Sequence, residues 1–151
     1  MLTLIEINKA VNKMIEDTLQ NTIFKDVKIV PEDIAEPIVR PSIKIDMESS
    51  INRKFNSNCG EKTLIFRVYF FAKNKNKYNI DNLKMQDILE TAFLDGLRVS
   101  DDYYIPISEV TSEVTDTVLV CSFDIYAVEI LPETDTNDIM ENLNIGLREE
   151  G

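Results

Sequence analysis

Two stretches of the chain alternate apolar side chains with a period of two. In residues 63–73, Leu64, Phe66, Val68 and Phe70 fall on one face, and residues 65, 67, 69 and 71 fall on the other. β-Branched and aromatic residues fill this stretch, as is typical of a strand. Because both faces are bulky, we predict a central strand with one face on a helix and the other against a loop or a neighbouring subunit. Residues 118–130 repeat the alternation and place Cys121 on the apolar face.

Two other stretches have a period near 3.6 and predict helices. The first covers residues 3–20 and the second residues 81–94, after a polar turn at 74–77. Asn79 or Asp81 is expected to cap the second helix, and Gly96 to close its end. The expected apolar stripes are Leu4, Ile7, Val11 and Met14 in the first helix, and Leu83, Ile88, Leu89, Ala92 and Phe93 in the second.

The remaining segments predict short strands and connections. A strand over residues 24–30 ends at Pro31, and a connection with two prolines leads to a strand over 41–47. Residues 48–61 read either as a loop or as an extended hairpin tip. Residues 98–110 read as an edge strand or a bulge because Pro106 interrupts them. The acidic segment 134–151 can form a short helix through Ile139, Met140, Leu143 and Leu147.

These elements predict an α+β fold. We expect a mostly antiparallel sheet of four or five strands, with two main helices packed on one face and a short C-terminal helix or tail. Residues 1–131 are expected to form a single domain, and residues 132–151 an acidic tail. The 151 residues are enough to bury a core. No apolar run approaches the roughly 20 residues of a membrane helix, and the N-terminus shows no export signal. The two cysteines indicate a reducing compartment.

The charge of the chain is acidic overall and unevenly placed. The sequence holds 27 acidic and 16 basic residues, a formal net charge of −11. Nine of the 16 basic residues lie between Arg40 and Lys77, whereas from Val99 onward there are 13 acidic residues and the single base Arg148. Nucleic-acid affinity comes mostly from Lys and Arg, so phosphate binding is not the expected main role. The asymmetry fits either a solvated, lopsided surface or a subunit that pairs head to tail with its own copies.

One group of acidic residues suggests that the chain could instead be an enzyme. Asn79 and Asp81 open a helix, and Asp101 and Asp102 follow it. This spacing resembles the RusA family of Holliday-junction resolvases, in which aspartates before and after a helix hold Mg²⁺ for phosphodiester cleavage. Here Asn79 stands where that family has its first aspartate, and Met85 stands where it has a lysine. Asp81 as a helix cap and Asp101-Asp102 as a turn explain the same residues without chemistry.

No other catalytic pattern is visible in the sequence. The chain has no histidine, which removes histidine-based zinc sites and triads. Its four glycines form no phosphate-binding loop. We therefore assign no catalytic residue, no metal ligand and no cofactor, and expect the chain not to be an enzyme.

The order of elements over most of the chain resembles a second family. A helix, two strands, a loop with Arg53 and Phe55, the aromatic strand 66–71, the helix 81–94, an irregular hairpin and the strand 116–123 follow one another. This order is similar to the small tail terminator proteins of tailed phages and of phage-tail-like bacteriocins in Gram-positive prophages. The resemblance implies a structural protein without catalytic residues. Its ring, usually a hexamer, sits on the last ring of tail-tube protein, stops tube growth and joins the neck or collar.

This resemblance also implies partners and a location. The expected partners are further copies of the chain, the tail-tube protein and a sheath, neck or collar protein, with DNA only as cargo and no membrane. The protein would be made in the cytoplasm of a bacterial host and end in a virion or tail-like particle. A head–tail connector or neck protein would show similar features, and that alternative stays open. The residues that we expect at subunit or tube contacts are Arg53, Lys54, Phe55, Lys73, Lys75, Lys77, Asp101 and Asp102.

Overall fold

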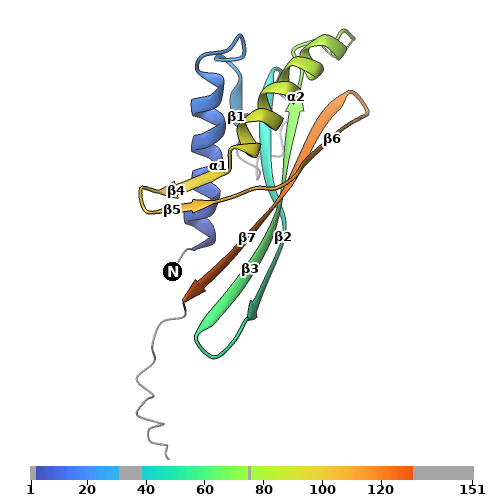
Figure 1. Ribbon diagram of the computed structural model, residues 1–151. Coiled ribbons are helices and arrows are strands. Elements are labelled where there is room, and N and C mark those ends of the chain that lie inside the picture. Colours follow the sequence, from blue (N-terminus) through green and yellow to red (C-terminus); the bar gives the residue numbers. More distant parts are fainter. Residues whose placement is uncertain (1–2, 31–38, 75, 131–151) are drawn as a thin grey trace, which may run out of the picture.

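One five-stranded sheet and two helices make up the main layers of the protein (Figure 1). The computed structural model describes residues 3–30, 39–74 and 76–130, and the structural statements below concern those residues. The strand order is β1-β2-β3-β7-β6, and β4 pairs with β5 in a separate hairpin. The elements are α1 (Leu4–Leu19), β1 (Lys28–Val30), β2 (Ser42–Lys54), β3 (Cys59–Phe71), α2 (Asn79–Leu94), β4 (Leu97–Ser100), β5 (Tyr103–Ile105), β6 (Val110–Thr115) and β7 (Val118–Ile130).

The predicted central strand is β3, which pairs along its length with β2 on one side and β7 on the other. Both pairings are antiparallel, as is that of β6 with β7. Of the strands in the described residues, only the short β1 pairs in parallel, with residues 42–44 of β2. The prediction of an α+β fold with a mainly antiparallel sheet is therefore confirmed, with one parallel pair added.

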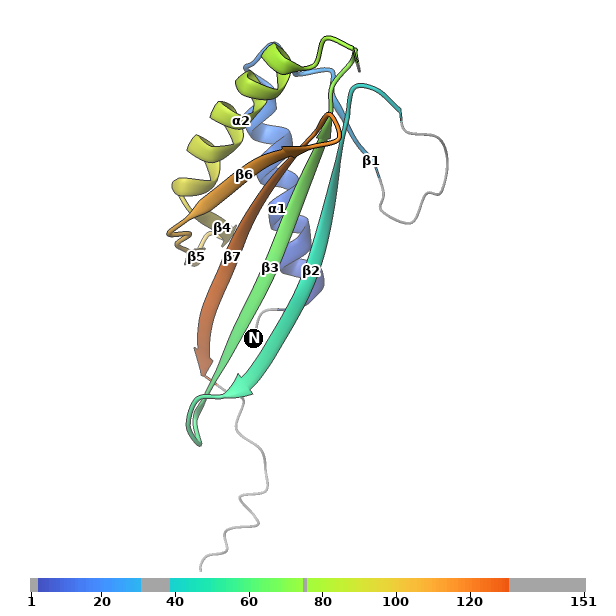
Figure 2. The same cartoon turned by 90° about the vertical axis from the view of Figure 1, so that its right-hand side faces the viewer.

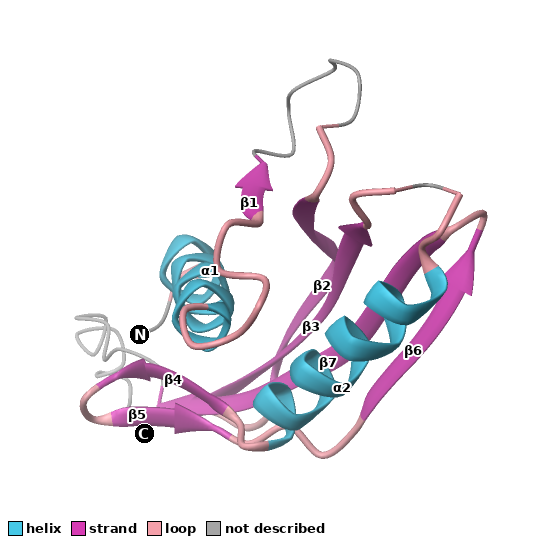
Figure 3. Ribbon diagram, turned by 90° about the horizontal axis from the view of Figure 1, so that it is seen from above, coloured by secondary structure: helices cyan, strands magenta, loops and turns pink. Residues whose placement is uncertain are grey.

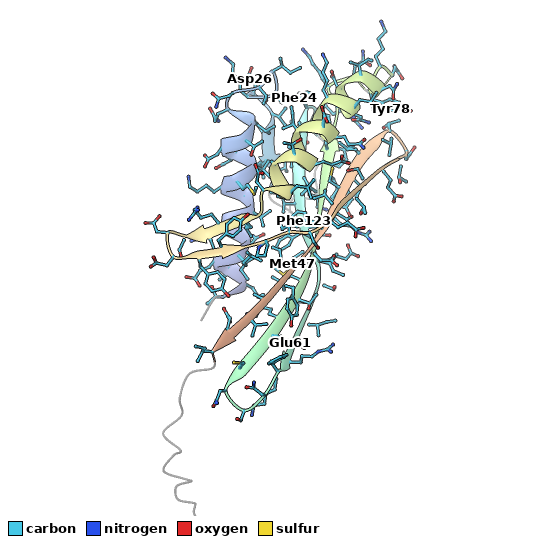
Figure 4. All side chains as sticks on the ribbon, in the orientation of Figure 1. Phe24, Asp26, Met47, Glu61, Tyr78 and Phe123 are labelled. Carbon is cyan, nitrogen blue, oxygen red and sulfur yellow. The ribbon has the colours of Figure 1, made fainter. Side chains whose placement is uncertain are left out.

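Both helices lie on the same side of the curved sheet, and the β4–β5 hairpin lies on that side too (Figure 3). The even-numbered face of β3 looks toward the helices, and Leu64, Phe66, Val68 and Phe70 are all fully buried there. Phe123 of β7 stacks on Phe66 at a centroid distance of 5.6 Å and on Phe93 of α2 at 4.2 Å. Phe123 accordingly lies where sheet and helix meet (Figure 4). Each such aromatic pair contributes about 0.5–1.5 kcal/mol beyond the area that it buries.

The predicted stripe of α2 is partly wrong, because the helix is rotated about its axis. Its buried residues are Asn82, Met85, Leu89 and Phe93, whereas Leu83 is 55% exposed. Asn82 takes a core position, and there its side chain donates a hydrogen bond to the Thr117 carbonyl in the β6–β7 turn, at 3.2 Å. Gly96 closes the helix as predicted, with a φ of +90° and its N–H donating to the Phe93 carbonyl at 2.9 Å, but the predicted N-terminal caps are wrong. Tyr78 is the N-cap residue and no side chain caps the helix, so Asn79 and Asp81 lie inside its first turn.

The first helix fits its prediction better. Thr3 caps it through a reciprocal pair of hydrogen bonds with Glu6. Those bonds favour the ionised carboxylate and lower the pKa of Glu6. Ile7 and Val11 are buried as expected and Met14 partly so, but Leu4 is 41% exposed. The helix buries Ala10, Ile15 and Leu19 instead, which continue the stripe toward its C-terminal end.

Three strand predictions need correction. The expected strand over 24–30 is only three residues long, because residues 21–26 form turns that bury Phe24. Residues 48–61 are mostly strand, so the extended-hairpin alternative is the right one. Residues 98–110 do not form one edge strand but the β4–β5 hairpin and the start of β6. The predicted C-terminal helix lies outside the described residues.

The lower halves of β2, β3 and β7 extend past α2, and Figure 2 shows their helix-free face. Among the described residues, no strand pairs with β2 beyond Lys44 on its outer side, or with β7 beyond Phe123. A bulge at Glu48 interrupts β2. We call residues 49–54 the β2 edge and residues 124–130 the β7 edge. Such unpaired edges are ready templates for another strand.

Candidate assembly surface

The turn between β2 and β3 forms a tip that its own hydrogen bonds hold in shape. The N–H groups of Phe55 and Asn56 both donate to the Cys59 carbonyl, at 2.9 and 3.1 Å. The Asn56 side chain accepts from the N–H groups of Asn58 and Cys59, at 2.8 and 2.9 Å, as asparagine often does in turns. We call residues 53–58 the basic tip. It carries the predicted contact residues Arg53, Lys54 and Phe55, all exposed.

A row of side chains on the helix-free face connects the tip with the β7 edge. Arg53 Nε lies 3.8 Å from Glu61 Oε1, and the Tyr126 hydroxyl donates to Glu61 Oε2 at 2.5 Å. The hydrogen bond to this carboxylate raises the pKa of Tyr126, because an ionised phenol could no longer donate it. Figure 4 places Glu61 in the extended part of the sheet, away from the helices. These contacts fix the orientation of the exposed Tyr126 side chain.

A hollow of about 310 Å³ lies between β5 and the β7 edge. Residues 102–106 line one side and residues 126–128 the other, mostly with aromatic and apolar side chains. Among the described residues that line the hollow, Asp102 is the one carboxylate. Burial and the nearby charge of Glu129 raise the pKa of Tyr103 in its wall. We call this feature the acidic hollow, because Asp102 and Glu129 give its surroundings a negative charge.

The β4–β5 hairpin is anchored to the end of α2. Gly96 has a φ of +90°, and a Cβ there would collide with the Tyr104 hydroxyl, so only glycine fits without a shift. That hydroxyl donates to the Asp95 carbonyl. The Arg98 guanidinium lies 5.9 Å from the Tyr104 ring centroid, and it donates to the Asp101 carbonyl at 3.4 Å. These contacts hold Asp101-Asp102 in the exposed turn of the hairpin.

The other predicted contact residues lie elsewhere. Lys73 and Lys77 are exposed in the connection between β3 and α2, at the end of the sheet opposite the basic tip. Lys75 lies outside the described residues. The seven predicted residues that the structure describes therefore do not form one site. Within the described part of the chain they divide among the tip, the β4–β5 turn and the β3–α2 connection.

The acidic residues that resembled a Mg²⁺ site are not brought together. Asp81 lies in the first turn of α2, and Asp101-Asp102 follow its far end. The helix rises about 1.5 Å per residue, so Asp81 and Leu94 lie about 20 Å apart along its axis. Among the described residues, no group of three or more Asp, Glu, His or Cys side chains could hold a metal ion. Asp101-Asp102 form a turn, as the non-catalytic interpretation expected.

Comparison with known families identifies the group to which the chain belongs. A model of the phage tail terminator protein family matches residues 6–138, which is most of the sequence. The chain belongs to the phage tail terminator protein family. The resemblance seen in the order of elements is thereby confirmed. Tail terminators are structural proteins of the phage tail, so the protein is virion-associated and associates with other tail proteins.

Other comparisons add less about this tail terminator. No curated protein matches the chain. A solved structure matches 88% of this chain and 100% of its own at 13% identity, with a TM-score of 0.43, a likeness too weak to carry an argument. None of the described helices is long and apolar enough to cross a membrane.

Sequence reasoning did not single out the β7 edge as part of a candidate assembly surface. Tyr126, Val128 and Ile130 are 50%, 44% and 80% exposed on the helix-free face, while their neighbours Ile125 and Ala127 are buried. The sequence does contain a sign of this edge, because the outward positions of the strand become apolar after Asp124. Only the pairing pattern shows that no strand of the described residues covers this edge.

Proposed function

We propose that this tail terminator caps the tail tube as a ring, ends tube polymerisation and joins the tube to the neck or collar. The single observation that carries the proposal is the family match over residues 6–138. A ring of identical subunits needs two different, complementary surfaces on each copy. The basic tip and the acidic hollow are such a pair, and they lie on different strands of the sheet. The expected ring is a hexamer.

The charge of the molecule agrees with a ring through which DNA passes. A formal net charge of −11 repels phosphates, so DNA would be cargo and not a tightly held ligand. The direct partners would be further copies, the tail-tube protein and a sheath, neck or collar protein. On this proposal the chain is made in the cytoplasm of the bacterial host and becomes part of a virion or tail-like particle.

Tube growth in the presence of the protein tests the proposal. Purified tail-tube protein would be polymerised with increasing amounts of the labelled full chain, and tube lengths and label positions would be read by electron microscopy. Capping predicts shorter tubes, with the label at one end only. An unrelated acidic protein at equal concentration should change neither quantity. Unchanged lengths, or label spread along the tube walls, would contradict the proposed function.

A further inference from the structure

The β2 edge and the β7 edge run in the same direction, and their residues pair with the same residues of β3. β2 and β7 both run antiparallel to β3, so they point the same way. Ser49 and Asp124 both pair with Ile65, and from that level the two edges run side by side with β3 as far as Gly60. Rotation about a ring axis preserves strand direction. The β7 edge of one copy can therefore accept the β2 edge of the next copy in parallel.

Exposed apolar side chains meet at the same levels on the helix-free face. Ile51 and Tyr126 both pair with residue 63, and Arg53 and Val128 both pair with residue 61. Ile51, Tyr126 and Val128 are 48%, 50% and 44% exposed. Cross-strand pairs of aromatic and β-branched residues stabilise a sheet by roughly 0.2–1 kcal/mol each. Pairing the two edges without a shift of register would place Ile51 against Tyr126, and Val128 against the aliphatic part of Arg53.

Charges are complementary on the other face. Lys54 pairs with Gly60, so it points to the helix side of the sheet, where β5 lies beside β7. With unshifted pairing, Lys54 of one copy reaches the level of Glu129 in the next copy, next to the hollow that Asp102 lines. The exposed Phe55 of the tip would lie next to the tyrosine side chains that line that hollow.

We propose that the β7 edge and acidic hollow of one copy bind the β2 edge and basic tip of the next copy, so that the sheet continues from subunit to subunit. This inference rests on the proposed ring and names the contact that closes it. Six copies with three long strands each would form a closed sheet of roughly 18 strands, a size at which barrels keep an open channel. A two-fold dimer would instead pair like edges.

A disulfide trap tests this contact. The background is the full chain with Cys59→Ser. Val128→Cys would be combined in it with Arg53→Cys, which faces Val128 in the unshifted register. A second variant would combine Val128→Cys with Ile51→Cys, which tests a register shift of two residues. Within one copy these positions are separated by β3, which places their Cα atoms roughly 9–10 Å apart, beyond the about 7 Å that a disulfide allows. Any disulfide therefore joins two copies. We expect oxidation to give a ladder of cross-linked species that extends past the dimer.

The matched controls are the single-cysteine variants, which should not cross-link. Cross-linking of Val128→Cys alone would show pairing of like edges and overturn the inference. A ring seen by light scattering without cross-links in either double variant would also overturn it, while leaving the proposed function intact. If no assembly forms with or without tubes, both the inference and the proposed function fail.

Charge reversal gives an independent measurement. Lys54→Glu and Asp102→Lys should each raise the concentration needed for half-assembly about tenfold, and their combination should restore assembly. Lys84→Glu, on the exposed side of α2, is the matched control and should leave assembly unchanged. A combined variant no better than the single ones, or an equal effect of Lys84→Glu, would overturn the assigned charge contact.

Discussion

Leu83 and Met85 lie two residues apart on α2, yet only Met85 enters the core. Met85 is fully buried and Leu83 is 55% exposed. A helix advances 100° per residue, so a small rotation decides which apolar residues are buried. With the rotation seen here, the buried Asn82 side chain donates a hydrogen bond to the Thr117 carbonyl at 3.2 Å. A polar residue at a core position is invisible to a search for apolar stripes.

Paired alanine substitutions test this rotation. Met85→Ala should lower the free energy of unfolding by about 2–5 kcal/mol because it leaves a cavity. Leu83→Ala should change it by less than about 0.5 kcal/mol, because the side chain already contacts water. Urea denaturation of the two variants and the parent measures both values. Equal losses in the two variants would contradict the observed face of α2.

The two cysteines should differ in reactivity. Cys121 is buried beside Ser112, and burial raises its pKa from 9.0 to about 11. Since the folded-state pKa is raised, the thiol contributes stability that is present below pH 9 and lost as the pH rises toward 11. A thiol reagent at pH 8 should therefore modify one thiol in the native protein, Cys59, and two after unfolding. Native Cys59→Ser should react with none, and rapid reaction of that variant would contradict the buried Cys121.

At the scale of elements, the sequence predicted the strands and helices with strong periodicity. The central strand, the last strand and both helices were found because their apolar residues repeat over more than ten positions. The remaining strands depend on which segments of the chain pair with one another. Residues 48–54 are polar apart from Ile51, and they are strand only because residues 60–65 offer them a partner. Of the proposed assembly surface, the tip and the Asp101-Asp102 turn were predicted from the sequence and stay a prediction, whereas the hollow required the fold that places β5 beside β7.

The β6–β7 turn gives a prediction about one element. Asp116 and Thr117 have φ values of 53° and 71°, which a tight hairpin needs and which a β-branched residue adopts only with strain. Thr117→Gly should therefore stabilise the protein by about 0.5–1 kcal/mol, and the carbonyl that Asn82 binds is retained. Thr115→Gly, in the adjacent strand, should destabilise it by a similar amount. Thermal unfolding of both variants measures these changes in stability. A loss of stability in Thr117→Gly would contradict the turn geometry.

At the scale of the whole molecule, opposite charges on different strands should make assembly sensitive to salt. The Debye length falls from about 10 Å at 0.1 M to about 3 Å at 1 M, so added NaCl should weaken contacts between the basic tip and the acidic hollow. Sedimentation velocity over this range should show the assembled fraction falling as salt rises. If the assembled fraction does not change with salt, charge pairing does not hold the subunits together. The apolar contacts between the edges would then be what stabilises the assembly.

The mass of the protein in solution tests the ring most directly. Light scattering after size exclusion would be measured for the full chain alone and after mixing with its tail-tube protein. We expect a species of about six times the 17.3 kDa chain, either spontaneously or on tube ends only. A monomer or dimer that stays unchanged when tubes are present would contradict the account.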